Sequence, residues 1–260
     1  MIKAKKKYGQ NFLKDESVLL KIIESMPKNN NVIVEIGPGL GDLTKKLVKY
    51  KDVKAYEVDR DLYSILRVEF INEINSGRLD LVLTDVLEVW NENHSLYEEK
   101  YDLIANLPYY IATNIILNAF SDSNCENIIV MVQKEVADKF TVTSGNSDFS
   151  ALGVISELLC LENKIILEVP PTSFNPPPKV DSSVIYLKKD MTKSLDSKFN
   201  KFLKVAFCQP RKKLIKNLSS GYNKDVLTKL FIDLEINENL RPHELSSSLY
   251  SQIYTMLKVI

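Results

Sequence analysis

The stretch Val34-Glu35-Ile36-Gly37-Pro38-Gly39-Leu40-Gly41 decides the fold of this chain. The apolar run at its start, residues 32–36, lies between polar residues and Gly37, so it predicts a short buried strand. Residues 42–49 carry a helical pattern. Glycines at a strand-to-helix turn allow a tight backbone and close approach to a ligand, because they lack a Cβ. By itself such a turn suits NAD, FAD or S-adenosylmethionine, and it also occurs as a plain turn.

Acidic residues near the turn favour S-adenosylmethionine. A dinucleotide site has the pattern G-x-G-x-x-G, whereas here the pattern is G-x-G-x-G with Glu35 in front of it. That carboxylate would repel a pyrophosphate but would help to hold a positively charged methionine group. Glu57 ends the next expected strand, about 20 residues on, and can accept both ribose hydroxyl hydrogens. Asp85 ends the third strand and could accept from the adenine amine, whereas Asp59 and Asp61 are better explained as helix-start charges.

Over the first two-thirds of the chain, short β-branched runs alternate with helical patterns, which predicts βαβ units and a mostly parallel sheet. Because parallel strands share one crevice at their carboxyl ends, we expect a Rossmann-like α/β fold of the class I S-adenosylmethionine-dependent methyltransferase type. After the polar stretch 188–196 no convincing strand follows, so we expect a catalytic domain over residues 1–189 and a small helical domain over 190–260. The expected strands are residues 32–36, 53–58, 79–83, 101–105, 127–132, 164–169 and 183–187. The expected helices include residues 42–49, 61–74, 113–120, 134–142, 203–207, 212–218, 226–234 and 249–257.

The segment Asn106-Leu107-Pro108-Tyr109, at the end of the fourth strand, suits methyl transfer to an aromatic amine. The amine lone pair of adenine is delocalised into the ring, so the nitrogen is a poor nucleophile. The side-chain oxygen of Asn106 and the backbone carbonyl of Leu107 or Pro108 can accept its two hydrogens and aim the lone pair at a methylsulfonium. Pro108 fixes the turn, and Tyr109 offers a ring on which a base can stack. The alternative is an Asx-turn beside a core tyrosine.

Four segments together resemble the KsgA-type small-subunit rRNA adenine dimethyltransferases, and the resemblance covers nearly the whole chain. Besides the two segments above, they are Tyr8-Gly9-Gln10-Asn11-Phe12-Leu13 and the run Glu168-Val169-Pro170-Pro171-Thr172-Ser173-Phe174-Asn175-Pro176-Pro177-Pro178-Lys179-Val180-Asp181-Ser182. The resemblance implies that Phe174 faces Tyr109 across an adenine flipped out of its stack, which makes Asn106, Pro108, Tyr109 and Phe174 the catalytic set. It also implies a set of residues that line the S-adenosylmethionine pocket: Asn11, Leu13, Gly37, Glu57, Asp85 and Asn106.

The resemblance implies a substrate as well. Two adjacent adenosines near the 3′ end of small-subunit (16S) rRNA would each receive two methyl groups, late in the assembly of a pre-ribosomal 30S particle. Arg211, Lys212 and Lys213 would contact RNA, because positive charge releases counterions and positions RNA without reading its sequence. The chain departs from the family pattern around Gly153, where a glycine has moved, and at Pro210, which interrupts the segment before Arg211.

Composition adds little that is specific. Lys plus Arg and Asp plus Glu both number 34, so the net charge is zero, which argues weakly against a nucleic-acid binder. A solvated face is the alternative for the basic cluster above and for the basic start, Lys3, Lys5, Lys6 and Lys7. Three cysteines without paired spacing and two histidines predict neither disulfides nor a metal site. No apolar run of about 18 residues or secretory signal is evident, so we expect a cytoplasmic monomer without a membrane segment.

Two rival functions stay open. An antibiotic-resistance enzyme that methylates adenine in large-subunit rRNA would share the glycine turn and the Asn-x-Pro-aromatic loop. A ribosome-assembly binding factor, or a transcription factor derived from such an enzyme, could keep these residues in vestigial form. The proline-rich run after residue 169 favours the small-subunit enzyme, and the complete catalytic set argues against lost activity.

Overall fold

The computed structural model describes residue 5 and residues 8–259. These fall into two compact units, of which the first comprises Met1–Ala137 and Leu161–Met191 and the second comprises Asp138–Cys160 and Thr192–Ile260. The expected boundary at residue 189 therefore lies close to the division at residue 191. Residues 138–160, expected in the catalytic domain, instead group with the C-terminal helices. The reason is packing, because the helix α8 (Ala151–Leu159) contacts α9 and α12 of that unit.

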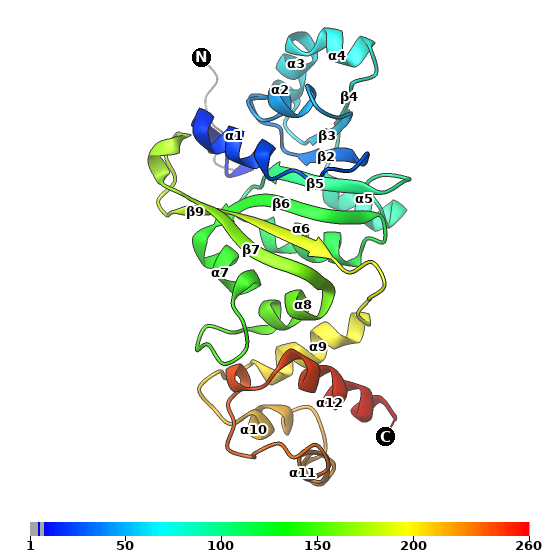
Figure 1. Cartoon of the computed structure of the whole chain (residues 1–260), viewed down its shortest axis with the longest axis vertical. Coiled ribbons are helices and arrows are strands. Elements are labelled where there is room, and N and C mark those ends of the chain that lie inside the picture. Colours follow the sequence, from blue (N-terminus) through cyan, green and yellow to red (C-terminus); the bar gives the residue numbers. More distant parts are fainter. Residues whose placement is uncertain (1–4, 6–7, 260) are drawn as a thin grey trace. The chain divides into compact units, whose positions relative to one another are not determined.

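A seven-stranded sheet forms the first unit, with the order β4-β3-β2-β5-β6-β9-β7 (Figure 1). The first five of these strands run parallel to one another, and β9 is antiparallel to β6. This confirms the mostly parallel sheet. A separate two-stranded pair joins β1 to β8. The strands are β1 (Phe12–Leu13), β2 (Val32–Ile36), β3 (Val53–Glu57), β4 (Leu79–Leu83), β5 (Tyr101–Asn106), β6 (Cys125–Gln133), β7 (Cys160–Val169), β8 (Phe174–Asn175) and β9 (Ser182–Lys189).

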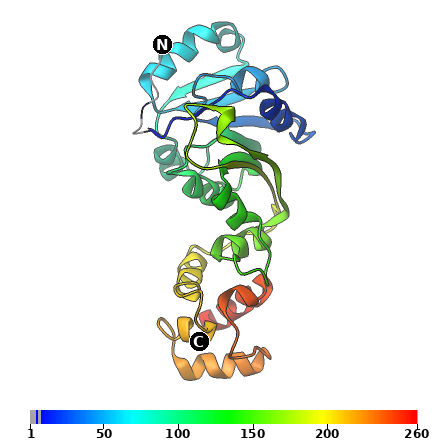
Figure 2. The ribbon, with the colours of Figure 1, turned by 90° about the vertical axis from the view of Figure 1, so that its left-hand side faces the viewer.

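The helices of this unit cover both sides of the sheet. Figure 2 shows α1 and α6 on opposite sides of it. Asp15 caps α1 by accepting a hydrogen bond from the Ser17 N–H, and Val18, Leu19, Ile22 and Ile23 of α1 are buried in the core. The helices are α1 (Glu16–Glu24), α2 (Thr44–Leu47), α3 (Arg60–Glu69), α4 (Ile71–Asn75), α5 (Val86–Asn93) and α6 (Ala112–Ser121), and a 3₁₀ turn spans Pro171–Ser173. The helix α7 (Lys134–Thr141) begins in this unit and ends in the second.

Three helices differ from the sequence-based expectation. The single helix expected over residues 61–74 is interrupted at Phe70, whose φ of −105° and ψ of 27° are not helical. The Phe70 ring is 3% exposed, so tertiary packing overrides the helical pattern there. The helix after the glycine turn shrinks to four residues, α2. An additional helix, α5, begins directly after Asp85.

The strand order reverses between β2 and β5, and this positions the site. From β2 the chain continues outward through β3 and β4, and it then returns to β5 on the other side of β2. In an open α/β sheet a crevice forms at such a switch point, beyond the carboxyl ends of the strands. The glycine turn follows β2 and Asn106 ends β5, so both lie at this crevice.

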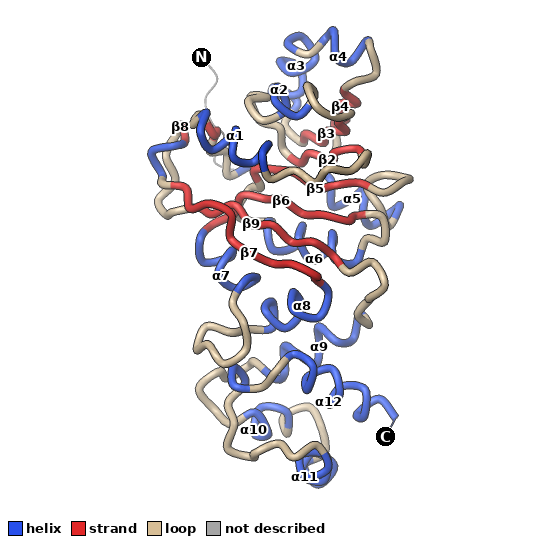
Figure 3. Tube along the Cα trace, viewed as in Figure 1, coloured by secondary structure: helices blue, strands red, loops and turns tan. Residues whose placement is uncertain are grey.

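From residue 192 onward, the described part of the second unit contains helices and loops but no strand (Figure 3). An aromatic cluster stabilises it: Phe202 lies 6.2 Å from Tyr250 and 5.5 Å from Tyr254, measured between ring centroids. The helix expected from residue 212 begins only at Leu214, because Lys213 has an extended ψ of 140°. Beyond α8, the unit contains α9 (Ser197–Ala206), α10 (Leu214–Leu218), α11 (Lys224–Asp233), a 3₁₀ turn at Pro242–Glu244 and α12 (Ser247–Val259).

Candidate active site

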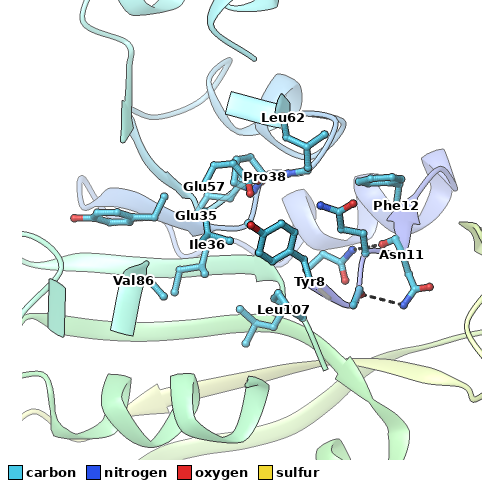
Figure 4. Close-up of a pocket in the computed structure, with 18 of the residues that line it drawn as sticks. Tyr8, Asn11, Phe12, Glu35, Ile36, Pro38, Glu57, Leu62, Val86 and Leu107 are labelled. Carbon is cyan, nitrogen blue, oxygen red and sulfur yellow. Dashed lines mark hydrogen bonds between the residues drawn. The ribbon is translucent and has the colours of Figure 1, made fainter. Parts of the chain in front are cut away.

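One pocket of the first unit lies at the switch point (Figure 4). It is lined by the N-terminal segment, the glycine turn and the residues that follow β3, β4 and β5. Figure 4 also shows that Tyr8, which sequence reasoning did not single out, points into the pocket. The structure brings together all the expected cofactor residues and three of the four expected catalytic residues, since the lining includes Asn11, Leu13, Gly37, Glu57, Asp85, Asn106, Pro108 and Tyr109.

The glycine turn is built on left-handed backbone. Gly37, Gly39 and Gly41 have φ values of 68°, 64° and 81°, which side chains rarely tolerate. The N–H of Gly37 donates to the Tyr56 carbonyl at 2.9 Å and so ties the turn to the end of β3. At Gly41 an added Cβ would lie 2.6 Å from the buried Phe70 ring, so this glycine is required by packing as well.

We expect Gly41→Ala to lower the free energy of unfolding by ~2–4 kcal/mol, because left-handed strain adds to the clash with Phe70. Gly77→Ala is the matched control. Gly77 has a φ of +75° but no neighbour within 4 Å of an added Cβ, so only the strain of about 1 kcal/mol applies. Urea denaturation of both variants measures the difference. Equal losses would contradict the packing role of Gly41.

Glu57 provides a buried carboxylate at the pocket. Its side chain is 3% exposed, and its two oxygens accept N–H bonds from Asp59 at 2.8 Å and from Gly39 at 3.3 Å. Burial raises the pKa of Glu57, and the backbone bonds partly oppose this. A carboxylate has about four lone-pair sites, so capacity remains for the two hydroxyls of a ribose. The donor set therefore fits a nucleoside cofactor.

Glu35 is more deeply buried than the sequence argument assumed when it assigned a negative charge to this residue. Its carboxylate accepts a bond from the Thr44 hydroxyl at 2.7 Å and is 2% exposed. Burial raises the pKa of Glu35 to about 8. The group is therefore mostly protonated near neutral pH, and it offers less negative charge to a methionine ammonium than the sequence argument assumed.

The two aspartates at strand ends have distinct positions. Asp59 caps α3 by accepting the Asp61 N–H, which confirms it as a helix-start charge. Asp85 caps α5 by accepting the Leu87 N–H at 2.9 Å. Asp85 is nevertheless exposed and lines the pocket, so its carboxylate can reach a ligand as well.

The acceptors expected for an amine lie at the end of β5. The Asn106 Nδ2 donates to the backbone oxygen of Asn11 at 3.2 Å. The Pro108 carbonyl already accepts the Ile111 N–H at 3.2 Å, which makes the Leu107 carbonyl the better candidate for the second acceptor. The sequence left open whether Leu107 or Pro108 provides the second acceptor, and the structure favours Leu107.

Tyr109 and Phe174 have different environments. Tyr109 lines the pocket, and its hydroxyl is 2.6 Å from the Ser182 Oγ, a contact that sequence reasoning missed. Burial raises the pKa of the Tyr109 hydroxyl. Phe174 is 4% exposed, pairs with Leu13 through β8 and β1, and belongs to the apolar core rather than to the pocket lining. Its ring would reach a base only after leaving these contacts, so its place in an aromatic clamp stays a prediction.

The basic residues divide between the two units. Arg211, Lys212 and Lys213 are exposed on the turn between α9 and α10 of the second unit. Lys5 belongs to the first unit and forms ion pairs of 2.6 Å with Asp59 and with Asp61. The other members of the basic start, Lys3, Lys6 and Lys7, lie outside the described residues.

In the part of the chain that the structure describes, no helix has both the length and the apolar character needed to cross a bilayer. In the same part, no three His, Cys, Asp or Glu side chains are grouped so that they could hold a metal ion.

The sheet order and the pocket at its switch point define a class I S-adenosylmethionine-dependent methyltransferase. The model of the ribosomal RNA adenine dimethylase family matches residues 1–258. The chain therefore belongs to this family of rRNA-modifying enzymes.

Individual relatives agree with this assignment. Ribosomal RNA small subunit methyltransferase A of Aliarcobacter butzleri is 63% identical over 257 residues, which cover 99% of this chain and 97% of that protein. The protein of the same name from Sulfurimonas denitrificans is 52% identical, with 99% and 95% covered. A dimethyladenosine transferase from Plasmodium falciparum superposes with a TM-score of 0.82 at 22% identity, covering 95% of this chain and 98% of that one. The 23S rRNA methyltransferase ErmE superposes with a TM-score of 0.71 at 21% identity, covering 95% of this chain and 100% of that one. These two structures support the fold alone.

Proposed function

We propose that the protein transfers methyl groups from S-adenosylmethionine to the N6 amines of two adjacent adenosines near the 3′ end of small-subunit rRNA. The proposed substrate is a pre-ribosomal 30S particle late in assembly, and the proposed enzyme is a cytoplasmic monomer. One observation carries the chemistry: Asn106 and Leu107 line the same pocket as Glu57. The choice of subunit is supported by the relatives named small subunit methyltransferase A.

The cofactor would be held by residues with complementary roles. Glu57 would accept the ribose hydroxyls, Asp85 the adenine amine, and Gly37 would allow close approach of the backbone. Asn11 and Leu13 would cover the same pocket from the N-terminal segment. When bound, S-adenosylmethionine supplies a methyl group made electrophilic by its sulfonium.

The residues at the end of β5 would prepare the amine. The Asn106 Oδ1 and the Leu107 carbonyl accept its two hydrogens, which localises the lone pair on nitrogen and directs it towards the methyl group. Tyr109 stacks on the base and helps to offset the cost of removing it from its helix. Directly after methyl transfer the nitrogen carries a positive charge, and this cation is far more acidic than the starting amine, so its proton can pass to water without a strong base.

Separate incubations of unmethylated small and large ribosomal subunits with labelled S-adenosylmethionine test the proposal. We expect mass spectrometry to find dimethyladenosine in small-subunit rRNA alone, with two adjacent stops in primer extension. Label confined to the large subunit would support the antibiotic-resistance rival. Binding to small subunits without any methyl transfer would support the assembly-factor rival, and either outcome would contradict the proposal.

We also propose that Arg211, Lys212 and Lys213 contact RNA. We expect Arg211→Glu combined with Lys212→Glu to weaken binding to small subunits and to lessen its salt dependence, because fewer counterions are released. The matched control is Lys224→Glu with Lys229→Glu, since these lysines are exposed on α11. Filter binding at several salt concentrations measures both pairs. If binding depended on salt equally in the two double variants, Arg211, Lys212 and Lys213 would be a solvated surface and would not contact RNA.

A further inference from the structure

The orientation of the Asn106 amide is dictated by the chain itself. A backbone carbonyl can only accept a hydrogen bond, so the group of Asn106 that faces the Asn11 oxygen at 3.2 Å must be the Nδ2. The Oδ1 consequently points the other way. An amide rotated by half a turn would present a donor to the amine and would fail to accept its hydrogen. The Asn11 carbonyl therefore selects the productive orientation.

The segment that carries this carbonyl is fixed on both sides. We call residues 8–15 the N-terminal strap. On one side, the Gln10 Nε2 donates to the Asp59 Oδ2 at 2.9 Å, and the Gln10 Oε1 accepts the Lys5 N–H at 2.7 Å. On the other side, β1 pairs with β8, and the Lys14 N–H donates to the Ser173 carbonyl at 2.9 Å. The strap therefore cannot shift at Asn11 unless one of these anchors opens.

The hydrogen bond between Gln10 and Asp59 holds the strap close to the proposed cofactor site. Asp59 is 2% exposed, so water competes little for its oxygens. Its own N–H donates to Glu57 at 2.8 Å, so the residues that hold the strap adjoin the carboxylate proposed for the ribose. Gln10 stands next to Asn11 in sequence, so its bond to Asp59 restrains the strap one residue away from the Asn11 carbonyl.

We propose that Gln10 is a positioning residue for methyl transfer. Its bond to Asp59 fixes the strap, the strap holds the Asn11 carbonyl, and the carbonyl keeps the Asn106 Oδ1 turned towards the amine. Gln10 touches neither the amine nor the methyl group. This inference rests on the proposed function of Asn106.

The experiment uses the full-length protein, unmethylated small subunits and saturating S-adenosylmethionine in single turnover. Gln10→Met keeps the length of the side chain but removes both the donor to Asp59 and the acceptor for the Lys5 N–H. We expect methyl transfer to slow by about tenfold. The dissociation constant for the cofactor should change by less than about threefold, because the two bonds lost join protein groups to each other and not to the ligand. Gln252→Met, an exposed glutamine on α12, is the matched control and should behave as the unchanged protein.

A second background separates positioning from general damage. In Asn106→Asp both side-chain oxygens accept, so orientation no longer matters, and adding Gln10→Met should slow that variant by less than about twofold. NMR measures the exchange of the Asn106 side-chain NH₂ hydrogens with solvent, and we expect this exchange to be faster in Gln10→Met. If Asn106→Asp is inactive, this exchange rate alone tests whether Gln10 positions Asn106. Unchanged exchange, an unchanged rate, or equal slowing in both backgrounds would overturn the inference. Failure of the proposed function is distinct, since the unchanged protein would then not methylate small subunits.

Discussion

Replacing Asn106 by alanine is expected to reduce methyl transfer at saturating cofactor by ~10²–10³-fold, the range found when one preorganised polar group is removed from an active site. The amine would lose the acceptor that localises its lone pair, and the backbone carbonyl of Leu107 would remain. Binding of S-adenosylmethionine should weaken by about tenfold or less, because Glu57 and Asp85 still line the pocket. Single-turnover transfer to unmethylated small subunits measures the rate, and calorimetric titration measures the affinity.

The control for this variant is Asn72→Ala, which makes the same substitution at an exposed position on α4. It should transfer methyl groups at the unchanged rate. Thermal unfolding of both variants tests whether a lower rate reflects lost structure, because Asn106→Ala also removes the hydrogen bond to Asn11. Turnover by Asn106→Ala within a few-fold of the unchanged protein would exclude Asn106 as the acceptor for the amine.

Local patterns predict the part of this site that depends on the parallel sheet. Glu57, Asp85 and Asn106 each follow or end a strand, and parallel strands bring their carboxyl ends to one edge. The pocket therefore gathers residues that the sequence alone could group. The sequence also indicates the tight turn after β2, since Gly37, Gly39 and Gly41 adopt left-handed backbone that other residues rarely tolerate.

Contacts between distant segments could not be predicted in this way. The Asn106–Asn11 bond spans 95 residues, and the Tyr109–Ser182 bond spans 73. Sequence periodicity does not specify which loops contact each other. All four residues nevertheless lie in the motifs quoted above, and a polar motif residue without an assigned role indicates a contact of this kind. Phe174 is a different case, because the sequence does not distinguish an aromatic ring that packs in the core, as Phe174 does in this structure, from one that faces a ligand.

The second large effect is expected for Glu57→Gln, which should raise the dissociation constant for S-adenosylmethionine by ~30–100-fold. Hydrogen bonds to a charged acceptor contribute about 1.5–3 kcal/mol, and an amide keeps only one of the two acceptor oxygens. Glu92→Gln, at an exposed position on α5, is the matched control and should bind as the unchanged protein does. Calorimetric titration with the cofactor measures all three proteins, and an affinity within twofold for Glu57→Gln would remove Glu57 from the ribose site.

The pH dependence gives an independent check of the same assignment. Burial raises the pKa of Glu57, and only its ionised form accepts two hydroxyl bonds. Affinity should therefore fall as the pH falls through that raised pKa, and the bound cofactor, by favouring the carboxylate, should lower the pKa and release protons on binding. Glu35 titrates in the same pocket with a pKa of about 8, so Glu35→Gln is titrated in parallel to separate the two steps. The step that belongs to Glu57 should persist in Glu35→Gln and vanish in Glu57→Gln, and its survival in Glu57→Gln would assign that step to another group.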